Sequence, residues 1–256
     1  MSLGRRTLAL MGTLGTSFGA SAGDYERGRP GYPPEAVNWI ASHASLIVLD
    51  AGAGTGKLTA ELVRQGHEVI ALDPDEAMLT ALSQNLPDVE TIVGTAEDIA
   101  LPEEAVDAVV FGQAWHWVDV DAACTEVARV LRPGGTLGLI WNIRDDRVPW
   151  VARLTEVMRG SKAEELLAGD GPRVAAPFET LERARFDWST PMTAAEIGAM
   201  VRSRSYFIAG DDDYRAQVIS NLGELLGGLP ALAGGGRIDV PYVTHAFRTF
   251  RPAGDT

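Results

Sequence analysis

Short apolar runs alternate with amphipathic segments along the first 145 residues, and this alternation predicts strands separated by helices. The apolar runs are rich in β-branched residues and are bounded by turn-forming residues, as buried strands are. We expect strands at residues 46–50, 67–72, 89–93, 106–111 and 136–141, and helices at 35–42, from 57 onward, at 75–85 and at 121–131. Strands that alternate with helices predict an α/β fold, with a mostly parallel sheet and helices on both faces.

The pattern is less regular after residue 148. We expect helices at residues 150–159, 163–168, 194–202 and 213–226, and strands at 181–188 and 242–250. The glycine-rich stretch 227–236 is expected to be a loop rather than a site. The second half of the chain therefore adds helices and a late strand to the alternating pattern of the first half.

The turn after the first expected strand suits an adenosine-containing ligand. Asp50 ends this strand and is followed by glycines at positions 52, 54 and 56, where a backbone without side chains lets a ligand approach closely. The second expected strand ends on Asp73, about 20 residues after the first glycine, where a carboxylate can accept both ribose hydroxyls. Strand, glycine turn, helix, strand and acid together predict an adenosine pocket.

Three cofactors can be weighed against this turn. A phosphate-binding P-loop requires glycine where Ala51 stands and Ser or Thr where Leu58 stands, so it is rejected. A dinucleotide fingerprint requires glycine at Lys57, which disfavours NAD. The third candidate, S-adenosylmethionine (SAM), carries an ammonium that Asp50 can attract, and it has no phosphate for Asp50 to repel. Asp50 can instead order the glycine turn through its amides, and both roles can coexist.

Composition limits the partners. The formal net charge is −13 and no stretch is rich in Lys and Arg, which argues against a nucleic-acid partner. Cys124 is the only cysteine, so we expect no intrachain disulfide and no metal site built on cysteines. No run approaches the ~20 apolar residues of a membrane helix. Arg5 and Arg6 suggest a twin-arginine signal, but the following apolar stretch is short and broken by glycines, so we expect a cytoplasmic protein.

The motifs at 50–56, 73, 94–98 and 131–135 stand in the order and spacing of class I SAM-dependent methyltransferases, which the chain resembles. The segments 17–19, 29–33, 113–117, 203–206 and 241–244, together with Tyr25, resemble the small-molecule branch that includes trans-aconitate methyltransferase. This resemblance implies a Rossmann-like seven-stranded sheet with an antiparallel last strand. It also implies an N-terminal arm at 1–34 and a methyltransferase domain at 35–256, with a cofactor half near 35–147 and substrate-side helical insertions near 148–235.

On this reading, the cofactor contacts come from the arm and from the loops after the strands. Arg29 can pair bidentately with the methionine carboxylate, although it can equally be a surface charge. Many relatives carry Asp where Thr95 stands, so adenine contacts are expected to pass to the Ala96 and Glu97 amides and to the carboxylate of Glu97 or Asp98. The expected cofactor-binding residues are Tyr25, Arg29, Asp50, Gly52, Gly54, Gly56, Asp73, Pro74, Ala96, Glu97 and Gln113.

The substrate is expected at the carboxyl ends of the fourth and fifth strands. His116 is a possible general base. It can instead form a packed wall with the neighbouring tryptophans, one of which attracts the sulfonium, and a carboxylate acceptor would need no base. An inward Arg144 would favour an anionic substrate, whereas residues 144–147 can also form a solvated salt-bridged loop. The expected substrate contacts are Trp115, His116, Trp117, Asn142, Arg144, Ser205, Tyr206 and Tyr242.

The sequence therefore predicts a SAM-dependent methyltransferase that acts on a small metabolite or natural product, with oxygen as the favoured acceptor. No Asn/Asp-Pro-Pro-aromatic turn follows the fourth strand, and this favours a small molecule over nucleic acid. Two alternatives stay open. One is an NAD-dependent oxidoreductase, and the other is a non-catalytic SAM-binding regulatory protein whose own side chains fill the substrate cavity.

Overall fold

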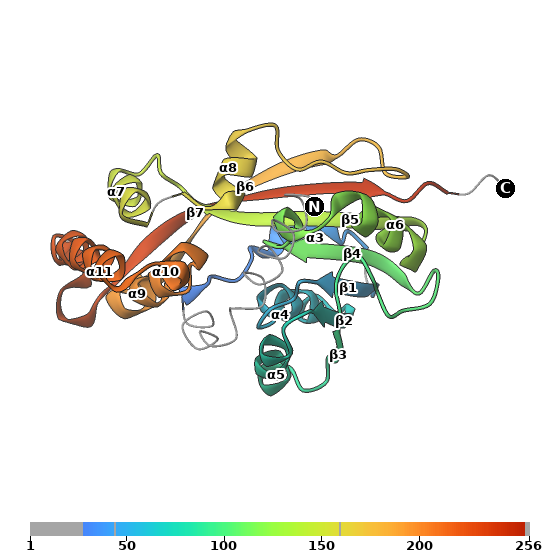
Figure 1. The fold of residues 1–256 in the computed structure, drawn as a ribbon, viewed down its shortest axis with the longest axis horizontal. Coiled ribbons are helices and arrows are strands. Elements are labelled where there is room, and N and C mark those ends of the chain that lie inside the picture. Colours follow the sequence, from blue (N-terminus) through green and yellow to red (C-terminus); the bar gives the residue numbers. More distant parts are fainter. Residues whose placement is uncertain (1–27, 44, 159, 254–256) are drawn as a thin grey trace, which may run out of the picture.

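Residues 28–43, 45–158 and 160–253 are described by the computed structural model of this chain, and a seven-stranded sheet runs through them in the order β3-β2-β1-β4-β5-β7-β6 (Figure 1). β7 is antiparallel to β5 and to β6, and the other neighbouring pairs are parallel. This order confirms the predicted Rossmann-like fold. The strands are β1 (Ile47–Ala51), β2 (Glu68–Asp73), β3 (Glu90–Val93), β4 (Val106–Gly112), β5 (Leu131–Arg144), β6 (Glu182–Thr193) and β7 (Arg237–Phe250).

The helices fall into two groups (Figure 1). One group surrounds the parallel strands and consists of α3 (Pro34–Ile40), α4 (Lys57–Arg64), α5 (Glu76–Asn85) and α6 (Val120–Val130). A second group lies toward the other end of the molecule, where β6 and β7 extend beyond the parallel strands; it consists of α7 (Pro149–Met158), α9 (Ala194–Arg202), α10 (Ser205–Ala209) and α11 (Asp212–Gly227). The short helix α8 (Lys162–Ala168) and the 3-10 turns at Trp115–Trp117 and Pro230–Gly235 complete the described elements.

Successive side chains of β1 lie on opposite faces of the sheet, because side chains alternate along a strand. Val48 packs in the cluster that α3 and α4 make with β4 and β5. Leu49 packs on the opposite face, in the cluster that contains the apolar side of α6. The core is thus two apolar layers with the sheet between them, and it holds the carboxyl end of β1 rigidly.

A separate apolar cluster binds the second group of helices to the long strands. Leu154 of α7, Met200 of α9 and Leu222 of α11 pack there with Met192 of β6 and Tyr242 of β7. β6 and β7 thereby carry the helices of 148–235 on the same sheet that forms the cofactor-side core.

Three strands differ from the expected ranges by more than one residue at an end, and proline and glycine explain these differences. β6 and β7 extend past Pro191 and Pro241, which we had expected to lie outside strands. Proline is tolerated at these points because β6 is an edge strand and because the β5–β7 register ends at Tyr242, one residue after Pro241. β5 begins at Leu131 and includes the expected turn at 132–135, where the register with β4 shifts and Gly134 has a φ of 77°.

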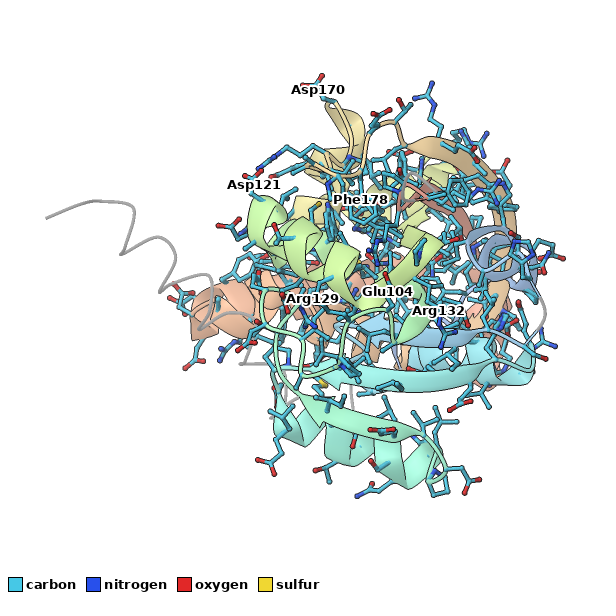
Figure 2. All side chains as sticks on the ribbon, turned by 90° about the vertical axis from the view of Figure 1, so that its right-hand side faces the viewer. Glu104, Asp121, Arg129, Arg132, Asp170 and Phe178 are labelled. Carbon is cyan, nitrogen blue, oxygen red and sulfur yellow. The ribbon has the colours of Figure 1, made fainter. Side chains whose placement is uncertain are left out.

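Two arginines tie the connection between β3 and β4 to the body of the domain (Figure 2). Arg129, on α6, donates to the carbonyl oxygens of Ile99 and Leu101. Arg132 forms an ion pair with Asp107 and bonds the Glu104 carbonyl. Within the described residues, no helix is long and apolar enough to cross a membrane.

Replacing Leu49 with alanine is expected to lower the free energy of unfolding by about 2–5 kcal/mol, because the change leaves a cavity in the middle of the core. Leu49 is 0% exposed. Val63→Ala is the matched control, since Val63 is 38% exposed and its truncation should cost below about 0.5 kcal/mol. Equilibrium urea unfolding of both variants checks this, and equal costs would contradict the two-layer core.

Candidate active site

The glycine turn joins β1 to α4 in the conformation that only glycine adopts easily. Gly52, Gly54 and Gly56 have φ angles of 74°, 55° and 90°. The amide of Gly52 donates to the Leu72 carbonyl at 2.8 Å, which fastens the turn to β2. A Cβ at Gly52 would lie 2.5 Å from the Cβ of Ala114, so the bare backbone here packs directly against the segment that follows β4.

Asp50 is fully buried beside this turn and is only half satisfied. Its Oδ2 accepts a hydrogen bond from the Thr59 hydroxyl at 2.6 Å, whereas its Oδ1 has no hydrogen-bond partner among the described residues. Burial, with a further contribution from the charge of Asp73, raises the pKa of Asp50 to about 7. An enclosed carboxylate oxygen without a partner is costly, and a cationic ligand group would relieve that cost.

Asp73 connects the end of β2 to the glycine turn. Its Oδ2 accepts from the Gly54 amide at 2.9 Å, and its Oδ1 accepts from the Asp75 amide at 2.8 Å. Burial raises the pKa of Asp73, which is 8% exposed. Each carboxylate oxygen can accept a second hydrogen bond, so these contacts leave capacity for ligand hydroxyls. Asp50 and Asp73 therefore both lie inside the fold, and the neighbouring Pro74 is exposed.

The segment after β3 supplies the next expected contacts. Ala96 is buried, and Glu97 is half-buried with its Oε1 accepting from the Asp119 amide at 2.8 Å, just before α6. Asp98 is exposed. The carboxylate of Glu97 is thus tied to the protein, and that of Asp98 lies at the surface.

A narrow cleft lies where β4 and β5 end, and we call it the central cleft. Gln113 follows β4, and Asn142 lies near the end of β5. The positively charged Arg29, Lys57 and Arg204 also line the central cleft, and none of its described lining residues is acidic. The full lining is Arg29, Pro30, Tyr32, Lys57, Gln113, Asn142, Arg204 and Tyr242.

The described part of the N-terminal segment closes one side of this cleft. A Cβ at Gly28 would collide with the backbone of Met200 in α9, so the segment packs tightly there. The Nε of Arg29 donates to the Ser203 hydroxyl at 3.3 Å. Residues 1–27, including Tyr25, lie outside the described residues.

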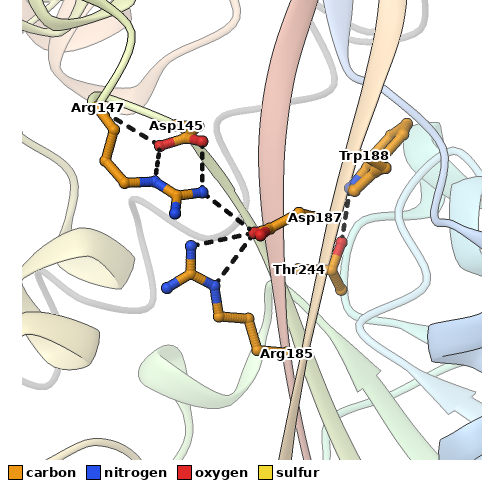
Figure 3. Close-up of polar contacts among 6 residues, drawn as sticks. All are labelled: Asp145, Arg147, Arg185, Asp187, Trp188 and Thr244. Atoms are coloured by element: carbon orange, nitrogen blue, oxygen red, sulfur yellow. Dashed lines mark hydrogen bonds and ion pairs between the residues drawn. The ribbon is translucent and has the colours of Figure 1, made fainter.

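A chain of hydrogen bonds positions Asn142. The Trp188 indole on β6 donates to the Thr244 hydroxyl at 2.8 Å (Figure 3), and this hydroxyl donates to Asn142 Oδ1 at 2.6 Å. Asn142 Nδ2 donates in turn to the Gly31 carbonyl at 2.8 Å. The side-chain amide of Gln113 donates to the Asn142 carbonyl at 3.0 Å. These hydrogen bonds therefore link β5, β6, β7 and the N-terminal segment through Asn142.

Arg144, the last residue of β5, and Arg147, which follows the strand, have different surroundings. Arg144 is 3% exposed and forms an ion pair with Glu164 of α8 at 2.8 Å. Arg147 is exposed and pairs with Asp145 and Asp187, which also binds Arg185 (Figure 3). The solvated salt-bridged loop that we weighed for residues 144–147 therefore exists, but it does not include the side chain of Arg144.

The aromatic turn after β4 divides its side chains between different environments. The sequence predicts that Trp115 contacts the substrate, but Trp115 is 2% exposed, packs edge-to-face on Phe111 and donates to the Arg173 carbonyl. It therefore lies in the core and does not line the cleft. Trp117 is half-buried, with the Lys162 ammonium 4.4 Å from its ring centre. His116 Nδ1 accepts from the Trp141 indole at 3.3 Å.

The surroundings of His116 decide its charge. Burial, and then the positive charges of Lys162 and Arg29, lower the pKa of His116 to about 4. The imidazole is therefore neutral near pH 7. Because Nδ1 accepts the Trp141 hydrogen bond, the proton resides on Nε2.

Two tyrosines complete the expected substrate side. Tyr242 donates to the Met200 sulfur at 3.2 Å and stacks on Trp188. The Tyr206 hydroxyl is buried without a described hydrogen-bond partner, and burial raises its pKa to about 12. Ser205 is the first residue of α10.

The sequence analysis did not predict several of the residues that line the cleft. Tyr32 and Arg204 lie within the segments 29–33 and 203–206, and Lys57 begins α4, but no local pattern indicated that the three line one cleft. Thr244 was likewise quoted only as part of a motif, and its bond to Asn142 joins residues 102 positions apart. The one available signal was that the segments 29–33 and 203–206 carry Arg29 and Arg204 and no acid.

Comparisons with known proteins decide the family. The family described as "Methyltransferase domain" matches residues 49–139. An uncharacterized methyltransferase from Mycobacterium tuberculosis is 44% identical over 248 residues, which cover 97% of this chain and 98% of the relative. An uncharacterized methyltransferase from Schizosaccharomyces pombe is 34% identical over 248 residues, and the match covers 91% of this chain and 96% of the relative. The chain belongs to the SAM-dependent methyltransferases.

Two further comparisons are narrower. A Malonyl-[acyl-carrier protein] O-methyltransferase from Yersinia pestis is 38% identical over 96 residues, 37% of this methyltransferase and 36% of the relative. The solved structure of a candidate type II methyltransferase from Anaeromyxobacter dehalogenans matches with a TM-score of 0.59 and 22% identity, covering 88% and 98% of the two chains, which shows a shared fold. The family assignment excludes the alternative that the protein is an NAD-dependent oxidoreductase. SAM is therefore the cofactor.

The acids beside the glycine turn suit this cofactor by their chemistry. Among the described residues the Oδ1 of Asp50 has no donor and can accept from an ammonium, and the carboxylate of Asp73 has capacity for hydroxyls. Gly52 and Gly54 are half-buried, whereas Gly56 is buried. SAM carries no phosphate, so its binding requires no phosphate-binding lysine or serine. The donor set therefore suits a zwitterionic nucleoside rather than a pyrophosphate.

The affinity for S-adenosylhomocysteine (SAH) is expected to fall roughly tenfold from about pH 8 to about pH 6, because Asp50 takes up a proton below about 7 and that proton must leave before an ammonium binds. Asp50→Asn should weaken binding and flatten this pH dependence. Calorimetry across the pH range checks both. The exposed Asp88→Asn is the control, and an unchanged pH dependence in Asp50→Asn would contradict the assignment.

Thr244→Val is expected to lower stability by about 1–3 kcal/mol, because it leaves the Trp188 indole and Asn142 Oδ1 without their partner. The substrate KM of the methyltransferase should rise as Asn142 loses its fixed orientation, while SAH affinity stays within about twofold. Urea unfolding and steady-state kinetics measure these effects. Thr249→Val, buried in the same strand, is the control; an identical response would show that Thr244 has no positioning role.

Proposed function

We propose that this methyltransferase transfers the methyl group of SAM to an oxygen of a small molecule bound in the central cleft. The observation that carries the proposal is the lining of the cleft, which consists largely of polar and cationic side chains where β4 and β5 end. The acidic chain, with a net charge of −13, also disfavours a nucleic-acid substrate.

Oxygen as the acceptor atom has two supports. The partial relative from Yersinia pestis is named an O-methyltransferase, although it matches only 37% of this chain. The central cleft also offers hydrogen-bond donors from arginine, lysine and amide groups, which suit an oxygen-rich substrate. The narrower likeness to the trans-aconitate branch belongs to the same proposal, as does a cytoplasmic location.

When bound, SAM supplies an electrophilic methyl group on its sulfonium. We propose that Asp50 receives the methionine ammonium, that Asp73 accepts the ribose hydroxyls and that Arg29 pairs with the methionine carboxylate. The backbone around Ala96 and Glu97 would contact the adenine. The bare backbone of the glycine turn, Pro74, Gln113 and, from the arm, Tyr25 complete the proposed cofactor site.

The proposed role of His116 is that of a hydrogen-bond donor. Its Nε2 carries the proton, and a pKa of about 4 makes the imidazole a weak base near neutral pH. An acceptor oxygen that is already ionised at neutral pH needs no base. His116, Trp117 and Asn142 would then orient the acceptor and exclude water from the methyl transfer.

The full chain should convert SAM to SAH when it is incubated with a panel of carboxylic acids and phenols, with a methyl ester or ether as the product seen by mass spectrometry. His116→Gln should retain activity within about tenfold, because loss of a general base would cost about 10²–10⁴. SAH binding without turnover on any acceptor would instead support the regulatory alternative. Methylation at nitrogen alone would refute the choice of oxygen.

A further inference from the structure

Arg204 is a charged side chain that lines the central cleft without a direct partner. It is the N-cap residue of α10, immediately after the end of α9. Its Nε is buried, and no hydrogen bond or ion pair joins its guanidinium to another residue in the described ranges. A guanidinium has five N–H donors and no acceptor, so leaving it enclosed and unpaired is costly.

The charges around Arg204 increase this cost. Burial, and then the positive charges of Arg29 and Arg144, lower the pKa of Arg204 to about 9, against weaker contributions from Tyr206 and Glu164. Glu164 is the acid that faces the cluster, and it already forms an ion pair with Arg144. Positive charge therefore exceeds negative charge at this wall, in a chain whose net charge is −13.

Two more donor groups, on residues that interact electrostatically with Arg204, also lack partners among the described residues. The Nε of Arg144 is buried without a hydrogen bond in the described structure, although Arg144 is only 3% exposed. The Tyr206 hydroxyl is buried and equally unpartnered within residues 28–253. Three unsatisfied donor groups thus come from β5 and α10 and its N-cap, and each would be satisfied by the same kind of acceptor.

We propose that Arg204 binds an oxyanion carried by the methyl acceptor, with the Tyr206 hydroxyl and the Arg144 Nε as additional donors. This inference rests on the proposed methyl transfer to a small molecule and adds its anionic class. An oxyanion accepts several charge-assisted hydrogen bonds at once, and a planar guanidinium recognises carboxylate or phosphate bidentately. In the competing assignment, Arg204 binds the carboxylate of the cofactor. The experiment distinguishes the two assignments, because only the competing one predicts a loss of SAH affinity when Arg204 is replaced.

The experiment measures small-anion binding by calorimetry to the full chain saturated with SAH. The probes are glutarate, its neutral diamide glutaramide, and inorganic phosphate. Glutarate should bind at least about tenfold more tightly than glutaramide, and Arg204→Gln should lose about tenfold of that affinity. Arg202→Gln is the matched control, two residues away, and should stay within about twofold. The relative affinities for glutarate and phosphate show whether the acceptor carries a carboxylate or a phosphate.

A second variant keeps the test informative if Arg204→Gln does not fold. Tyr206→Phe removes only one hydroxyl, and it should weaken glutarate binding by about threefold while the melting temperature changes little. SAH affinity should be unchanged within about threefold in both variants.

Three results would overturn the inference. One is glutarate affinity in Arg204→Gln equal to that of the unmodified chain. Another is an equal loss of SAH affinity, which would assign Arg204 to the cofactor. The third is no binding of glutarate or phosphate up to about 20 mM, a concentration at which even a weak specific site is occupied. SAH binding to the unmodified chain is measured first, so failure of the cofactor assignment is distinguished from failure of the anion site.

Discussion

The half-satisfied carboxylate of Asp50 is the constraint on which the rest of the site depends. A charged group in the middle of a packed core is costly, and the Thr59 hydroxyl satisfies only one of its oxygens. The sheet tolerates this cost because β1 lies between β2 and β4 and is held by apolar layers on both faces. The strand end is therefore rigid, and its unmet acceptor is available to a cationic ligand group.

The long strands connect this cofactor side to the substrate side. β5 and β7 pair over nine residues, from Thr136 with Phe250 to Arg144 with Tyr242, so the core and the outer helices share one hydrogen-bonded surface. Asn142 lies within this pairing and is oriented from β6 through Thr244. The orientation of Asn142 thus depends in part on β6, an edge strand of which no described residue lines the cleft.

The electrostatics of the cleft are opposite to those of the whole chain. Overall the protein is strongly acidic, yet arginine and lysine gather where the proposed acceptor binds. Burial, and after it the repulsion between like charges, lowers the pKa of Arg204 and keeps His116 neutral. A buried wall of like charges stores unfavourable free energy that an anionic ligand would release. The same field makes a neutral imidazole better suited to donating a hydrogen bond than to removing a proton.

Local order was readable from the sequence because it depends on neighbouring residues. The apolar runs, the three glycines after Asp50 and the acid at the end of β2 act over a few positions, and they were sufficient for the parallel sheet and an adenosine-binding turn. The enzyme family came from the resemblance of the motifs at 50–56, 73, 94–98 and 131–135. Strand ends were less predictable where Pro191 and Pro241 occur, because only the sheet shows which strand is at an edge.

What only the tertiary structure decided were the contacts between distant segments. Trp115 and His116 are adjacent in the chain, but one packs in the core and the other accepts a hydrogen bond from Trp141. Arg204 and Arg29 are 175 positions apart, yet both line one cleft and their charges interact. Burial and long-range Coulomb interactions set the charge state and donor capacity of these side chains, and both depend on which segments fold together. The cofactor turn is therefore a property of the sequence, whereas the character of the acceptor site is a property of the fold.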